Sequence, residues 1–245
     1  MMKHPVFITG AASGIGRQCA LTLAKHYDLV LLDRQESALK ALEKELHSSH
    51  QNTYVVVDLN DEGALNKALQ NLSIEGLEAL INVASLSPEN KPFTDVTSDL
   101  MLAMFEVNTL APMRLFQWAY PYLLKGKTKA MINVSSVHTK TGLPKGGVFR
   151  ASKRALETWS EQIALDYAKE GLRVNTICPG GIQSKMLKAT DSTFGYSIET
   201  YRQEAPLKQE VSAQDVADLV MYLLSDSARS ITAQTFVIDA GYSKR

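Results

Sequence analysis

Short apolar runs alternate with longer amphipathic segments along this 245-residue chain. Apolar residues recur at helical spacing in the longer segments, which predicts helices, and the short runs predict strands. The expected strands are residues 5–9, 28–33, 53–58, 77–82, 130–135, 173–178 and 235–238. The expected helices are residues 15–26, 37–47, 61–71, 101–124, 149–169 and 212–224, the last opened by a Ser212–Asp215 pair that resembles a capping box.

The expected strands are apolar throughout, which indicates a parallel sheet whose two faces are both buried beneath helices. Repeated strand–helix units predict an α/β fold, a Rossmann-like doubly wound sheet of about seven parallel strands with helices on both faces. The length fits a single domain over residues 1–245. Residues 183–210 lack clear periodicity, which is typical of a lid, although an ordinary surface excursion would look the same.

Composition narrows the class of protein. Basic and acidic residues balance at 26 each, without a long basic run, so we expect no nucleic-acid partner. The amino terminus has no signal-peptide core, and no apolar run is long enough to cross a bilayer, which predicts a cytoplasmic protein without membrane contact. Cys19 and Cys178 are too few for a disulfide framework or a metal cluster, so we expect two buried thiols and no metal.

A glycine-rich turn, TGAASGIG at residues 9–16, joins the first expected strand to the first expected helix. Glycines let the backbone turn tightly and approach a pyrophosphate, and the free N–H groups at the helix start attract that anion. The motif lies between a strand and a helix, as a dinucleotide site requires. It therefore predicts such a site, with a merely tight turn as the alternative.

Two carboxylates end the second and third expected strands. Asp33 can accept hydrogen bonds from the adenosine ribose and would repel a 2′-phosphate, so we expect NAD rather than NADP. The neighbouring Arg34 is the argument for NADP, because a guanidinium can hold that phosphate. Asp58 can reach the adenine amino group, or can serve as a plain helix cap.

Several motifs, in their order along the chain, resemble those of the short-chain dehydrogenase/reductase family of the classical type. The glycine turn is the first, NVAS at residues 82–85 stands where the family has NNAG, and a Pro-Gly pair follows the sixth strand at residues 179–180. The family's structural asparagine, catalytic serine and catalytic lysine are matched by Asn108, Ser136 and Lys153. The resemblance covers essentially the whole chain and implies interconversion of a secondary alcohol and a ketone with a nicotinamide cofactor.

The resemblance also implies a role for each site residue. Ser136 would polarise the substrate oxygen, Lys153 would hold the nicotinamide ribose, and Asn108 would distort its helix and position a water beside Lys153. Each has a plainer alternative. Ser136 can be an ordinary turn residue, with the adjacent Ser135 as the competing candidate for its role. Lys153 can lie on a solvated helix face, and Asn108 can be a satisfied amide of the core. The implied cofactor-binding residues are Gly10, Ser13, Gly14, Ile15, Gly16, Asp33, Arg34, Asp58, Leu59, Asn82, Ala84, Lys153, Pro179, Gly180, Ile182 and Ser184.

Position 149 departs from the family pattern, because Phe149 stands four residues before Lys153 where the family has tyrosine. A tyrosine there would lie one helical turn from the lysine, whose charge would lower the phenol pKa and make it a general acid or base. Phenylalanine keeps the ring and lacks the proton. His138, near Ser136, is a candidate replacement for the proton donor, although a lone histidine is more often incidental.

Two histories are consistent with Phe149. The chain is an engineered Tyr→Phe variant of an NAD(H)-dependent oxidoreductase, with low or no activity, or it is a natural pseudoenzyme that binds NAD(H) for regulation or interaction. The altered motif at residues 82–85 favours the natural origin, whereas the otherwise intact site favours the engineered one.

The sequence gives less specific signals for the substrate and for the oligomeric state. An apolar or mixed substrate pocket is suggested by the lid residues Met186, Leu187, Phe194, Tyr196 and Tyr201, which can equally form the core of the lid. The family commonly forms homotetramers, so we expect a homotetramer or homodimer. The helices expected at 101–124 and 149–169 carry apolar residues for that interface, or for the core, in Phe116, Trp118, Leu156 and Trp159.

Overall fold

The computed structural model describes residues 4–46, 51–183 and 197–245. Their strands form one parallel sheet of seven strands in the order β3-β2-β1-β4-β5-β6-β7, which confirms the predicted fold. The order reverses between β1 and β4, and ligands of such sheets bind at the carboxyl ends of the strands at that point. The strands are β1 (Val6–Thr9), β2 (Leu29–Asp33), β3 (Asn52–Val56), β4 (Ala79–Asn82), β5 (Ala130–Val134), β6 (Arg173–Pro179) and β7 (Thr235–Ile238).

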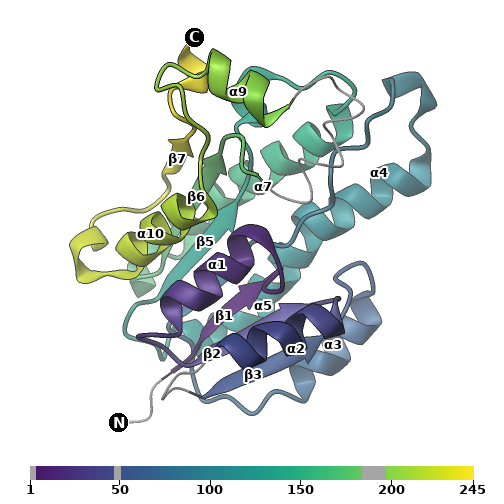
Figure 1. Ribbon diagram of the computed structural model, residues 1–245. Coiled ribbons are helices and arrows are strands. Elements are labelled where there is room, and N and C mark those ends of the chain that lie inside the picture. Colours follow the sequence, from purple (N-terminus) through teal and green to yellow (C-terminus); the bar gives the residue numbers. More distant parts are fainter. Residues whose placement is uncertain (1–3, 47–50, 184–196) are drawn as a thin grey trace.

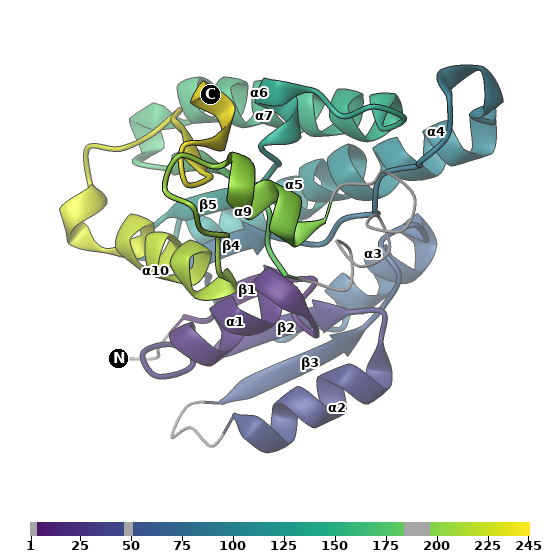
Figure 2. The same cartoon turned by 45° about the horizontal axis from the view of Figure 1, so that its top comes forward.

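Helices cover both faces of the sheet (Figures 1 and 2). One layer contains α1, α2 and α10, and the opposite layer contains α3, α5 and α7. The α-helices are α1 (Gly14–Leu23), α2 (Glu36–Glu45), α3 (Glu62–Gln70), α4 (Ser98–Phe105), α5 (Ala111–Leu123), α6 (His138–Thr141), α7 (Gly147–Asp166), α9 (Ile198–Glu204) and α10 (Ala213–Leu224).

Strand register explains why the central strands are apolar at every position. Ile8 in β1 pairs with Leu31 and Ile81 in the flanking strands, and all three side chains join the core beneath α1 and α10. The adjacent Phe7 points to the other core, beneath α5 and α7. The expectation of burial on both faces is wrong at the two edges, where Val56 of β3 and Val237 of β7 are exposed because an edge strand has a neighbour on one side only.

The helix expected over residues 101–124 is interrupted. A π-helical turn, Glu106–Leu110, separates α4 from α5, and Asn108 lies within it. The distortion of this helix, which the family resemblance implied, is therefore present. The capping box of α10 is also confirmed, since Ser212 and Asp215 bond to each other's backbone N–H groups.

Part of the expected lid, residues 184–196, lies outside the described residues, and with it lie Ser184, Met186, Leu187, Phe194 and Tyr196. The described remainder contains α9. Tyr201 of that helix is fully buried against Val137 and Tyr242, and its hydroxyl donates to the Asp239 carbonyl. Of the two alternatives for Tyr201, packed core describes it and pocket wall does not.

Candidate functional site

A cleft of about 590 Å³ opens where β1, β2, β3 and β4 end. It contains much of the predicted dinucleotide site. Its lining includes the predicted residues Gly10, Ser13, Gly14, Ile15, Asp33, Arg34, Asp58, Leu59, Ala84 and Ile182. Sequence reasoning missed other lining residues, which are Ala12, Arg17, Leu32, Gln35, Val57, Val83, Ser85, Leu86, Val107 and Gln183.

The glycine turn shapes one wall of this cleft. At Gly14 the backbone φ is +51°, and an added Cβ would meet no atom within 4 Å, so the position is open toward the cleft. A Cβ at Gly16 would lie 2.1 Å from the Gly10 carbonyl oxygen, so this glycine allows α1 to pack closely on the turn. Ser13 at the N-cap makes no side-chain hydrogen bond to the helix. The helix start therefore has no side-chain cap from Ser13, and it faces the cleft.

Asp33 holds the glycine turn as well as lining the cleft. One carboxylate oxygen accepts the Ala12 N–H at 3.0 Å, and the other accepts the Gln35 N–H at 2.9 Å. The side chain is buried, yet each oxygen keeps a further lone pair. The carboxylate is thus fixed in place with acceptor capacity that a ribose hydroxyl can use.

The cations that line the cleft are both paired with carboxylates. Arg34 lies 3.3 Å from Asp58, and Arg17 bonds to Glu45. Both pairs are exposed, and exposed pairs contribute little stability, so either guanidinium can turn toward a ligand at low cost. Arg17 follows the glycine motif directly, which is the signal that sequence reasoning overlooked.

Other predicted cofactor residues lie away from the cleft lining. The Asn82 amide donates to Asn133 at 2.8 Å between β4 and β5, where both side chains are buried. Pro179 ends β6, and the following Gly180 N–H donates to the Ile238 carbonyl at 2.7 Å. These contacts fix the strand ends from which the neighbouring Ala84 and Ile182 reach the cleft.

The two adjacent serines after β5 have different surroundings. The Ser135 hydroxyl is buried and donates to a Glu157 carboxylate oxygen at 2.6 Å. The Ser136 hydroxyl is half-buried and accepts the His138 N–H at 3.2 Å, which leaves its own proton free for another acceptor. Ser136 is therefore the serine whose hydroxyl can serve a substrate. The His138 ring bonds to the Gly142 carbonyl at 3.1 Å, and burial lowers its pKa.

Asn108 connects the loop after β4 with α7. Its Oδ1 accepts the Leu86 N–H at 2.9 Å and the Ser85 hydroxyl at 3.0 Å, and its Nδ2 donates to the Ser152 hydroxyl at 3.0 Å. The side chain is fully buried and satisfied. It has the contacts of a core amide, and its backbone lies within the π-helical turn.

Lys153 is buried and extends to the end of β5, where its Nζ donates to the Val134 carbonyl at 2.9 Å. It does not lie on a solvated helix face, which removes that alternative. Burial lowers the pKa of its ammonium to about 8, although negative charge at Cys178 and Glu157 acts in the opposite direction. Its charge can therefore change near neutral pH.

Phe149 lies in the first turn of α7, one turn before Lys153, with its ring in an apolar cluster. The ring is 4% exposed and packs beside Met104 and Val148. Glu89, in the loop after β4, fixes this end of the helix, since its carboxylate accepts the N–H groups of Val148 and Phe149 at 2.7 and 3.1 Å. The ring therefore has a defined position, but it has no hydroxyl group that could donate or accept a proton.

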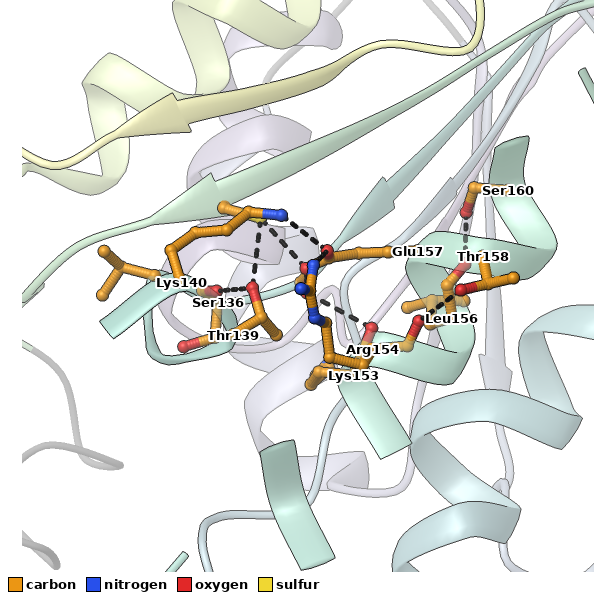
Figure 3. A network of polar contacts seen from close by, with 12 residues as sticks. Ser136, Thr139, Lys140, Lys153, Arg154, Leu156, Glu157, Thr158 and Ser160 are labelled. Carbon is orange, nitrogen blue, oxygen red and sulfur yellow. Dashed lines mark hydrogen bonds and ion pairs between the residues drawn. The ribbon is translucent and has the colours of Figure 1, made fainter. Parts of the chain in front are cut away.

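Sequence reasoning also missed Glu157, the centre of the network in Figure 3. Its side chain is 4% exposed and bonds to Lys140 at 2.7 Å and to Arg154 at 3.1 Å. The signal was present in the sequence, because an acidic residue four positions after Lys153 falls on the same buried helix face. Cys178 is buried against it, and Cys19 is buried elsewhere, as expected for both thiols.

Comparison with known proteins assigns this arrangement. A family model described as enoyl-(acyl carrier protein) reductase matches residues 10–243, which is nearly the whole chain. The chain belongs to the short-chain dehydrogenase/reductase family. The uncharacterized oxidoreductase YohF of Escherichia coli is 30% identical over 98% of this chain and 96% of its own length. The short-chain dehydrogenase/reductase aba4 of Botryotinia fuckeliana is 30% identical over 97% and 95%.

Solved structures of similar proteins include dehydrogenases and reductases. 4-Hydroxyisoleucine dehydrogenase complexed with NADH and succinate is 27% identical, with a TM-score of 0.86 over 98% of this chain and 100% of that one. L-sorbose reductase from Gluconobacter frateurii, complexed with NADPH and L-sorbose, shares the fold, with 24% identity and a TM-score of 0.91 over 99% and 97%. Within the described residues of this chain, no helix is long and apolar enough to span a membrane, and no cluster of His, Cys, Asp and Glu suits a metal ion.

Proposed function

We propose that this chain is an NAD(H)-binding oxidoreductase scaffold for a secondary alcohol and its ketone, whose proton-transfer step is impaired because Phe149 replaces the catalytic tyrosine. The observation that carries the proposal is the buried Phe149 ring, fixed one helical turn from Lys153. Family membership supports the reaction class, and the structurally similar dehydrogenase with bound NADH supports the cofactor class.

The cleft residues fit a dinucleotide. The open position at Gly14 and the start of α1 suit a pyrophosphate, which helix N–H groups bind as an anion. The fixed Asp33 carboxylate suits the adenosine ribose, and its negative charge disfavours a 2′-phosphate. Arg34 is paired with Asp58 at the surface, and it remains the argument for NADP because this exposed pair is weak. When bound, the cofactor donates or accepts the hydride.

The chain's own residues would bind and orient the reactants. The Ser136 hydroxyl would donate to the substrate oxygen, and the Lys153 ammonium would hold the nicotinamide ribose hydroxyls. Asn108 would act through its backbone on a water beside Lys153. The phenol that should exchange a proton with the substrate oxygen is missing, and losing a positioned general acid or base costs about 10²–10⁴ in rate. Cofactor binding does not depend on that hydroxyl.

One observation favours a second candidate, a binding protein that uses NAD(H) as a signal. The side chains of the cluster around Phe149 are apolar, including Met104, Val148 and Leu86, so the ring is packed as a core residue. Apolar packing of this kind around Phe149 is what we expect of a natural pseudoenzyme that has lost catalytic activity.

We also propose that the chain assembles as a homotetramer or homodimer through α4, α5 and α7. Phe116 and Leu156 are buried within one subunit, so they belong to the core rather than to an interface. Trp159 is 50% exposed on α7, and Leu102 on α4 is also exposed, which supports an interface on these helices. A monomer mass in light scattering at micromolar concentration would contradict the assembly.

The experiment that tests the function is Phe149→Tyr, assayed with NADH against a broad panel of ketones and alcohols. The proposal predicts a gain on the order of 10²-fold or more in turnover, because the phenol would lie beside Lys153 and Ser136. The binding-protein alternative predicts no activity across the panel, and a macromolecular partner whose affinity for the unmodified chain depends on NADH.

A further inference from the structure

The most densely bonded buried charge of the described residues is the Glu157 carboxylate. It accepts from Ser135 at 2.6 Å, Lys140 at 2.7 Å, Arg154 at 3.1 Å and Cys178 at 3.3 Å. Burial alone would raise the pKa of Glu157, but hydrogen bonds from Lys140, Ser135 and Thr139 hold it below its ordinary value. The carboxylate is therefore charged at neutral pH.

The partners of Glu157 come from the three segments that carry the site. Lys153 precedes Glu157 by one turn of α7, and Ser135 and Lys140 flank Ser136 in the turn after β5. Cys178 lies next to Pro179 at the end of β6, close to the cleft residue Ile182. Figure 3 shows the Lys140 and Arg154 side chains reaching the Glu157 carboxylate. A single side chain thus joins the segments whose relative placement the site requires.

If Glu157 served only to pack these segments together, its charge would not be needed. Replacing a buried ion pair by well-packed apolar residues is often neutral or stabilising, so the charge itself has to be explained. Lys153 offers the explanation, because it is a buried cation on the same helix face, four residues away. Burial penalises its ammonium, and a fixed anion nearby offsets that penalty.

We propose that Glu157 is a positioning residue that keeps the Lys153 side chain charged at the end of β5, where its Nζ donates to the Val134 carbonyl. Two groups that can carry negative charge, Cys178 and Glu157, act to raise the pKa of Lys153. Burial raises the pKa of the Cys178 thiol to about 11, so that thiol is neutral where Lys153 titrates. Glu157 is therefore the anion that acts there. Lys140 and Arg154 are the cations that face Glu157, and they moderate its effect.

Direct titration of Lys153 tests the proposal without reference to the proposed function. The ¹³C NMR signal of its ε-carbon, assigned by its loss in Lys153→Met, should titrate with a midpoint of about 8. Glu157→Gln should move the midpoint to lower pH by on the order of one unit, because the supporting charge is lost. Glu161→Gln, an exposed acid one turn further along α7, is the matched control and should leave the midpoint unchanged.

A second variant separates charge from packing. Lys140→Gln removes a cation from the same network, so the charge of Glu157 acts on Lys153 with less compensation, and the midpoint should move to higher pH. A structural role would shift both variants in the same direction, since both disrupt the network. The proposal is overturned if Glu157→Gln leaves the midpoint in place, or if both variants shift it the same way. If Glu157→Gln does not fold, the direction in Lys140→Gln decides.

The consequence for the cofactor rests on the proposed function. If NADH binds the charged form of Lys153, its affinity is complete below the Lys153 pKa of the free protein and falls as the pH rises through about 8. In Glu157→Gln the fall should begin at lower pH, giving on the order of tenfold weaker NADH binding near the original midpoint. NADH affinity that is independent of pH, together with the expected NMR shifts, would overturn the Lys153–cofactor contact while the role of Glu157 stands.

Discussion

Two helices, α1 and α7, begin near the same edge of the sheet, and the N–H groups of their first turns are capped differently. At the start of α1, Ser13 makes no side-chain hydrogen bond, and the first turn faces the cleft. At the start of α7, the Glu89 carboxylate bonds to the N–H groups of Val148 and Phe149. The start of α1 has no cap from the Ser13 side chain, and the start of α7 is capped by a carboxylate of the chain itself. The first suits a ligand, whereas the second fixes a side chain.

This difference separates binding from chemistry. The α1 side contains backbone donors and the Asp33 acceptor, all still in place. On the α7 side, the Phe149 ring is fixed by packing and Lys153 by its bond to Val134. The ring is a hydrocarbon, however, and cannot transfer a proton. A change at position 149 should therefore alter turnover and leave cofactor affinity nearly untouched. Each prediction below tries to break or sharpen that division.

The largest effect is expected at Ser136, tested in a Phe149→Tyr background where turnover can be measured. Ser136→Ala should lower turnover by about 10²–10³, because it removes a donor to the developing oxyanion. Ser135→Ala should mainly lower the melting temperature, since it removes one of the donors to the buried Glu157 carboxylate, at about 1–3 kcal/mol. If Ser135→Ala abolished turnover and Ser136→Ala did not, the assignment of the two hydroxyls would be reversed.

A smaller effect is expected at Asp33, on the binding side. Asp33→Asn removes the charge and one of the two acceptor oxygens that hold the glycine turn, so it should weaken binding of both cofactors and shift the preference between them toward NADPH by roughly tenfold, about 1.4 kcal/mol. Paired NADH and NADPH titrations of the variant and the unmodified chain measure the shift. Tighter NADPH binding by the unmodified chain would show that Arg34 and Arg17 outweigh Asp33.

The smallest effect is expected at Glu89. Glu89→Gln removes the charge at the start of α7 and should cost about 0.5–1 kcal/mol of stability, seen as a lower melting temperature. NADH affinity should stay the same, because Glu89 is bonded to α7 rather than to the cleft. A loss of NADH affinity larger than the loss of stability would mean that the two helix starts are coupled.

Features with local causes could be predicted from the sequence. Residues 235–238 form β7 as expected, and the Ser212–Asp215 capping box lies within one turn. The π turn could not be placed from the hydrophobic pattern alone, because Asn108 bonds to Leu86 and Ser152, which are far away in the sequence. The same reason separates Ser135 from Ser136, since Glu157 decides which hydroxyl turns inward.

In the candidate site, too, features set by local sequence could be predicted, and features set by contacts between distant segments could not. The glycine turn is a local motif, and most of its predicted residues line the cleft. Gly16 stays a predicted cofactor residue, and the structure shows in addition that a Cβ there would collide with the Gly10 carbonyl, so this glycine also serves packing. Lys153 was predicted by its spacing from position 149, but its burial and its bond to Val134 depend on how α7 packs on β5.

The central claim, that position 149 separates binding from chemistry, is tested most directly by measuring NADH affinity and ketone-dependent NADH oxidation side by side in the unmodified chain and in Phe149→Tyr. The account predicts dissociation constants that agree within about twofold. It also predicts turnover that rises on the order of 10²-fold or more with tyrosine. An NADH affinity that changes tenfold with the hydroxyl, or no NADH binding by the unmodified chain, would contradict it.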